Sequence, residues 1–212
     1  DILPYIRNIG LDVSETLSNF LVVLSLIPNG TMKEDFFFNL LEMNIQEKRK
    51  YKHAIRSGQE KSLLYIDKRN VDGKIEIVYK IYPHIKQAIM ALPSFGASEF
   101  LHMFHISVAE KIEMLTMGEN TALPPRFSDE LISLVRGVLE NLPYKAGKYT
   151  SFYLTYIRFL WVYADLPMES LKFLNAIERE IGNRRIHLLN TDLCQIYRTF
   201  GHIYASVGDD ES

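Results

Sequence analysis

Apolar residues recur at helical spacing near the start of the chain and then change to a strand-like pattern. One buried helical face is defined by four positions at i, i+3, i+4 and i+7: Leu17, Phe20, Leu21 and Leu24. The turn signal at residues 28–30 ends this helix, and the segment Thr31–Glu34 has the capping-box spacing that would open a second helix. A third helix is predicted at residues 46–57, and Gly58 beyond it indicates either an early helix end or a close packing contact.

Two segments rich in β-branched and aromatic residues follow, at residues 63–67 and 74–81. They flank Asp72-Gly73, a dipeptide that tolerates the positive φ angles of a tight turn, and so they predict a β-hairpin. Pro83 then suits the first turn of a further helix. The order of three helices, a hairpin and a helix predicts a winged helix-turn-helix domain over residues 1–93.

The pattern from residue 94 to residue 212 is helical throughout, and no further strand is predicted there. Helices are expected at six segments: 98–105, 107–117, 128–142, 149–164, 168–181 and 192–206. Two segments share Tyr, Phe, Tyr and Ala at an offset of 41 residues: Tyr156, Phe159, Tyr163 and Ala164, then Tyr197, Phe200, Tyr204 and Ala205. The second copy, with Phe200-Gly201, Tyr204 and Gly208-Asp209, resembles the first helix of a tetratricopeptide repeat, although the offset exceeds that repeat's period of about 34 residues. The predicted fold class is therefore mainly α, with the winged helix followed by an α-helical, tetratricopeptide-like repeat domain over residues 94–212.

Length and composition narrow the function classes. The 212 residues are 47% hydrophobic and 24% charged with a net charge of −2, so no global field recruits nucleic acid. The chain has a single cysteine, Cys194, which excludes an internal disulfide and a Cys-based zinc site. We predict that its thiol lies in the core and that the protein resides in a reducing, cytoplasmic compartment. No apolar run approaches the ~20 residues of a membrane span, so no membrane partner is expected. The chain does not begin with Met, and we expect it to be a segment of a larger protein.

Basic residues concentrate on the third predicted helix and its exit. Six Lys or Arg stand against two Glu at residues 47–61, although residues 12–93 together carry 12 Lys and Arg against 10 Asp and Glu. A helix in this position can enter the major groove of DNA, with phosphate contacts from nearby cations. The candidate nucleic-acid-binding residues are Lys48, Arg49, Lys50, Lys52 and Arg56. A solvated helix face is the simpler interpretation of the same charges, so nucleic acid is the less favoured partner.

The helical half of the chain offers a second set of candidates. Stacked helix pairs form extended concave surfaces that bind other proteins. Five arginines are candidates to line such a surface: Arg158, Arg179, Arg184, Arg185 and Arg198. The sequence contains no phosphate-binding loop, H-E-x-x-H or G-x-S-x-G motif, so we expect no enzyme activity and no cofactor in these residues. Glu99, His102 and His105 have the spacing of one helix face, but histidines among apolar residues are more often packed in a core, and no metal site is predicted.

The hairpin region resembles a known family. Lys61–Asp67, the turn at Asp72-Gly73 and the exit Tyr79–Ile89 look like the winged helix of the signal-transduction ATPases with numerous domains (STAND), which include NLR-like and apoptotic ATPases. The resemblance covers residues 17–89. It implies a winged helix that packs against a nucleotide-binding domain and helps to hold the ATPase inactive. Tyr82 stands where the family has a nucleotide-sensing histidine, so that role is not implied for this chain.

These features predict a regulatory and protein-interaction segment of a larger signalling ATPase, which relays between a nucleotide-binding domain outside these residues and a sensor surface. The resemblance implies a role in innate immunity or cell death, with a protein or a neighbouring domain of the same chain as partner. The alternative is a transcription regulator whose winged helix binds nucleic acid and whose helical domain dimerises or senses a ligand. A plain scaffold, with the winged helix as a protein-binding module, is the third reading.

Overall fold

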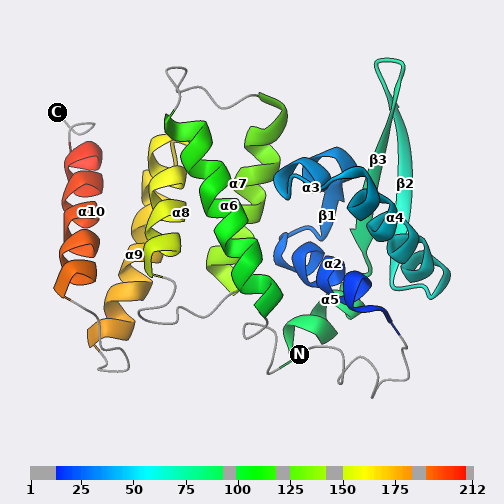
Figure 1. Ribbon diagram of the computed structural model, residues 1–212. Helices are drawn as coiled ribbons and strands as arrows, with labels where there is room; N and C mark the ends of the chain where they lie inside the picture. Colours follow the sequence, from blue (N-terminus) through cyan, green and yellow to red (C-terminus); the bar gives the residue numbers. More distant parts are fainter. Residues whose placement is uncertain (1–12, 93–98, 118–124, 142–149, 183–189, 209–212) are drawn as a thin grey trace. The chain divides into compact units, whose positions relative to one another are not determined.

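The computed structural model describes most of the chain as helices and a small three-stranded antiparallel sheet (Figure 1). The described residues are 13–92, 99–117, 125–141, 150–182 and 190–208. The chain divides into two compact units, the first of Asp1–Val108 with Arg136–Asn141 and the second of Ala109–Val135 with Leu142–Ser212. The prediction of a mainly α protein is confirmed.

The first unit opens with helices and strands in mixed order. Its elements are α2 (Glu15–Leu26), β1 (Thr31–Lys33), α3 (Glu34–Leu40), α4 (Ile45–Glu60), β2 (Leu64–Val71), β3 (Lys74–Ile81) and α5 (Pro83–Met90). A capping box starts α4, since Asn44 accepts hydrogen bonds from the Gln46 and Glu47 amides and the Glu47 carboxylate accepts one from the Asn44 amide. Pro83 occupies the first turn of α5, as predicted.

The predicted capping box at Thr31–Glu34 is wrong, because the first three of these residues form strand β1. Thr31 pairs with Lys80 and Lys33 with Val78 in an antiparallel ladder with β3. Helix α3 begins only at Glu34 and has no side-chain cap. The strand forms because Gly30, with a φ of 62°, turns the chain and its carbonyl accepts a hydrogen bond from the Ile81 amide at 3.0 Å. The sheet therefore has the order β1-β3-β2.

The predicted β-hairpin is confirmed. Strands β2 and β3 pair in register from Leu64 with Ile81 to Val71 with Lys74. Asp72 and Gly73 both have positive φ values, of 52° and 78°, as a tight hairpin turn requires. The tip of this hairpin extends beyond the helices of its unit (Figure 1).

The core of the first unit gathers on α2, and α4 packs closely against it. Phe20 makes edge-to-face contacts with Phe37 at 4.9 Å and with Tyr79 at 5.2 Å between ring centroids. Helix α4 runs through Gly58 without ending, so the close-contact interpretation of this glycine is confirmed. A Cβ added at Gly58 would lie 2.8 Å from a methyl group of Leu17.

The remainder of the chain is helical in its described part. The helices are α6 (Glu99–Met117), α7 (Pro125–Asn141), α8 (Thr150–Val162), α9 (Pro167–Gly182) and α10 (Asn190–Gly208). The prediction of two helices at residues 98–105 and 107–117 is wrong, since α6 runs unbroken through both. Ser107, at the predicted start of the second helix, donates to the Met103 carbonyl one turn earlier. None of the described helices combines the length and the apolar character that a membrane crossing needs.

Candidate functional site

The basic residues of α4 do not share one environment. Arg49, Lys50 and Arg56 are exposed, and we call these three the basic face of α4. Lys48 is only half-exposed and lies 6.0 Å from the centroid of the Phe38 ring. The predicted nucleic-acid-binding set therefore contains both solvent-facing cations and cations held by the fold.

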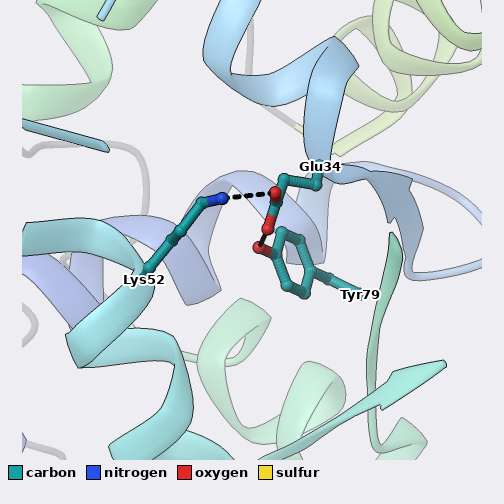
Figure 2. Close-up of polar contacts among 3 residues, drawn as sticks. All are labelled: Glu34, Lys52 and Tyr79. Atoms are coloured by element: carbon teal, nitrogen blue, oxygen red, sulfur yellow. Dashed lines mark hydrogen bonds and ion pairs between the residues drawn. The ribbon is translucent and has the colours of Figure 1, made fainter. Parts of the chain in front are cut away.

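Lys52 belongs to the second kind. Its ammonium group lies 2.7 Å from the carboxylate of Glu34 and 5.6 Å from the Phe38 ring centroid. The same carboxylate accepts a hydrogen bond from the hydroxyl of Tyr79, so Glu34 lies between Lys52 and Tyr79 (Figure 2). Tyr79 is only 2% exposed. Burial, and then the bond to Glu34, raise the pKa of Tyr79 above its ordinary value, which keeps its hydroxyl a donor. This trio joins α3, α4 and β3.

The five candidate arginines of the helical half are placed differently from one another. Arg158 on α8 and Arg198 on α10 line one cavity in the second unit. Arg179 on α9 is exposed, and its Nε donates to the Asn175 carbonyl of its own helix at 3.3 Å. Arg184 and Arg185 lie outside the described residues.

The cavity is a groove between α8 and α10, and its volume is about 550 Å³. Its lining residues are Ser151, Leu154, Thr155, Arg158, Trp161 and Val162 of α8, with Gln195, Arg198, Thr199 and His202 of α10. On each helix these positions repeat at three- and four-residue steps, so each helix presents one face to the groove. We call this site the α8–α10 groove.

Helix α9 supports the groove by packing against both α8 and α10 (Figure 1). The hydroxyl of Ser170 donates to the Ile157 carbonyl of α8 at 3.1 Å. The link between α8 and α9 is closed by Asp165, with a φ of 53°, and by the Leu166 amide, which donates to the Leu160 carbonyl at 2.9 Å. This tight link fixes α9 antiparallel to α8.

Trp161 and His202 connect the two helices that form the groove. The indole nitrogen of Trp161 donates to the hydroxyl of Ser206 at 3.0 Å, and its ring stacks on His202 with 6.3 Å between centroids. Arg198 also contacts His202, through Nε to Nε2 at 3.4 Å. Sequence reasoning missed Trp161 and His202, although the repeat of polar positions along each helix was a signal that these faces were not core.

The two repeated aromatic segments differ in helix position and in burial. Tyr163 and Ala164 follow the last residue of α8, whereas Tyr204 and Ala205 lie within α10. Phe159 and Phe200 are both buried, at 1% and 7% exposure. Tyr156 is 1% exposed, whereas its counterpart Tyr197 is 53% exposed. The tyrosine at the first matched position is therefore buried on α8 and exposed on α10.

The structure also places His105 and Cys194, the histidine and the cysteine that the sequence analysis discussed. His105 on α6 is buried, and burial followed by the charge of His102 lowers its pKa from 6.5 to about 4, so it is neutral at physiological pH. No group of three or more His, Cys, Asp or Glu is placed to hold a metal ion within the described residues. The prediction of a core thiol is wrong, since Cys194 is exposed on α10. Cys194 lies on the solvent-exposed side of that helix.

Comparison of the chain with protein-family models, with curated proteins and with solved structures found no match. The site is therefore interpreted from its own geometry.

Proposed function

We propose that this chain is a non-catalytic regulatory and protein-interaction segment of a larger signalling ATPase of the NLR-like kind. In this proposal residues 1–93 are a winged helix and residues 94–212 are tetratricopeptide-like helical repeats. The order helix, strand, helix, helix and hairpin, with β1 pairing to β3, supports the winged helix. The third strand adds to this support because it was not used in the sequence-based assignment.

The observation that carries the interaction role is the α8–α10 groove. Two helices present polar and basic faces to one cavity of about 550 Å³, and a third helix supports both of them. Stacked helices commonly bind extended protein segments along such surfaces. We propose that the partner is a protein, or a neighbouring domain of the same chain, in a cytoplasmic setting that suits a chain with one cysteine.

The full-length gene product tests this proposal. We expect it to contain a G-x-x-x-x-G-K-[ST] loop before the winged helix and to bind ATP or ADP when purified. The double substitution Arg158→Ala with Arg198→Ala should then change ATP turnover or its response to the partner, whereas the control Arg179→Ala should not. A full-length product that has no nucleotide-binding loop would refute the ATPase assignment.

The basic face of α4 favours nucleic acid as a second candidate partner. Arg49, Lys50 and Arg56 are exposed, and within the described residues none of them forms an ion pair. Cations at this place of a winged helix contact phosphates in proteins that bind DNA.

Binding to random-sequence duplex DNA over a salt series tests this second candidate. Phosphate contact predicts an affinity that falls steeply with salt and is lost when Arg49 and Lys50 are both changed to Glu. The matched control changes Lys172 and Arg179, two exposed cations of α9, to Glu. Absence of binding at low salt, or equal loss in both double variants, would exclude a specific role for α4 in binding nucleic acid.

A further inference from the structure

The α8–α10 groove differs in charge from the part of the chain that contains it. Residues 97–212 carry 11 Lys and Arg against 15 Asp and Glu, so their net charge is negative. The described residues that line the groove nevertheless include Arg158 and Arg198 and no acidic residue. A local positive site on a negative background attracts anionic groups to one place rather than to the surface in general.

The two arginines reach this cavity from opposite helices. Both residues are exposed, and neither forms an ion pair with another described residue, so their guanidinium donors can serve a ligand. The contact of Arg198 with His202 uses Nε, and the donors on its terminal nitrogens are not used by any bond found among the described residues. A guanidinium group binds a carboxylate through two parallel hydrogen bonds, which specifies geometry as well as charge.

The rest of the lining is suited to a peptide. Ser151, Thr155 and Gln195 supply neutral polar groups that can pair with a peptide backbone. Trp161, held by its bond to Ser206, and the 52%-exposed Val162 supply apolar surface beside the charges. Alternating polar, cationic and apolar groups along a groove fit an extended segment that carries both acidic and apolar side chains.

We infer that the α8–α10 groove binds an acidic peptide segment, with Arg158 and Arg198 each paired to a carboxylate and an apolar side chain of the peptide against Trp161. This inference rests on the proposed interaction function and specifies the chemistry of the partner. The carboxylates of the peptide supply negative charge to a groove whose lining has two arginines and no acidic residue. The apolar side chain of the peptide contacts the indole ring of Trp161.

The chain reports on this site without a label, because Trp161 is its only tryptophan. The probe is the tryptophan-free, C-terminally amidated peptide Ac-EELEELEEV-NH2, and the control probe is the neutral Ac-QQLQQLQQV-NH2. We expect the acidic probe to change the Trp161 emission saturably, with an affinity that weakens as salt rises. We expect Arg158→Ala and Arg198→Ala each to weaken binding about tenfold, the loss typical of one charge-assisted hydrogen-bonded pair. The matched control Arg179→Ala, an exposed arginine outside the groove, should bind like the unchanged chain.

The outcomes separate this inference from the proposed function. Equal binding of the acidic and neutral probes would overturn the acidic specificity while leaving a peptide-binding groove. No emission change with the acidic probe at low salt, or unchanged affinity in both groove variants, would overturn the inference itself. Tighter binding of a single-stranded oligonucleotide than of the peptide, lost in the same variants, would overturn the peptide as ligand. Far-UV circular dichroism of each variant checks that its helices are retained.

Discussion

Replacing Glu34 tests how the first unit is held together. The Glu34 side chain is 12% exposed and accepts from Tyr79 and from Lys52, the latter at 2.7 Å (Figure 2). Glu34→Ala leaves the hydroxyl of a side chain that is 2% exposed without its acceptor, which costs about 1–3 kcal/mol. The lost ion pair adds only about 0.5–1 kcal/mol because the Lys52 side chain is 43% exposed. We expect Glu34→Ala to lower the free energy of unfolding by about 1.5–4 kcal/mol in total.

A double-mutant cycle isolates the orphaned hydroxyl from the other effects. Tyr79→Phe alone should cost about 1–1.5 kcal/mol, since Glu34 keeps Lys52 as a partner. The double variant should cost about 1–2 kcal/mol less than the sum of the two single variants, because no buried donor is left unpaired. Lys52→Met should cost less than about 1 kcal/mol, since the methionine side chain still covers the Phe38 ring.

The assay is urea unfolding followed by far-UV circular dichroism, with Trp161 fluorescence recorded in parallel. Trp161 is the only tryptophan and lies in the second unit, so its signal separates unfolding of that unit from the circular dichroism change. Lys50→Met, on the exposed side of the same helix, is the matched control and should stay within about 0.5 kcal/mol of the unchanged chain. Additive effects of Glu34→Ala and Tyr79→Phe, within about 0.5 kcal/mol, would refute this account of the trio.

Three further predictions concern packing, backbone strain and pH. Gly58→Ala should lower the thermal midpoint of unfolding, because the added methyl group would lie 2.8 Å from Leu17. The cost of this overlap should exceed the helix-propensity gain of about 1 kcal/mol, and a higher midpoint would contradict this packing. Gly73→Ala should cost about 1 kcal/mol in the same melts through its positive φ alone, because no atom lies within 4 Å of the added Cβ, and Gly73→Asn should recover most of it. Folding lowers the pKa of His105 from 6.5 to about 4, so between these pH values the unfolded chain binds a proton that the folded chain does not. The free energy of unfolding should therefore decrease by up to about 3 kcal/mol as the pH falls across that window. His105→Phe should remove this dependence in urea unfolding measured over a pH series, and an unchanged slope would contradict the assignment.

Elements with local causes were predictable from the sequence. The hairpin was found because Asp72-Gly73 sits between two β-rich segments and only such a dipeptide readily adopts two successive positive φ angles. The helices were found because their apolar positions recur at helical spacing. In both cases the information lies within a few residues of the element itself.

Strand β1 was not predictable in this way, because its cause is distant in the chain. Thr31–Lys33 is short and carries the local spacing of a helix cap. It becomes a strand through its ladder with β3, in which Thr31 pairs with Lys80. Met32, which is 1% exposed, is thereby turned into the core. The long-range pairing with β3 determines the structure of this segment, and a window of neighbouring residues does not contain that information.

The α8–α10 groove was predictable only in part, because it is formed by two helices that are distant in the sequence. Arg158 and Arg198 could be proposed as surface residues from the sequence, because each lies on an amphipathic helix. Which helices are neighbours depends on the packing of α9 against both α8 and α10. The neighbour of each arginine in space, and therefore the cavity that they share, follows only from that packing.

The cations of α4 show why a charge count does not identify a binding surface. Lys52 forms an ion pair with Glu34 at 2.7 Å, and Lys48 lies 6.0 Å from the centroid of the Phe38 ring. Reversing the charge of Lys52 would place a carboxylate beside Glu34, so lost nucleic-acid binding in such a variant would report a damaged fold. Arg49 and Lys50 can be reversed without this cost because they are exposed, whereas the charge of Arg56 acts on the pKa of Tyr79. A variant set restricted to Arg49 and Lys50 therefore distinguishes a phosphate-binding helix from one whose lysines mainly hold α3 and β3 in place.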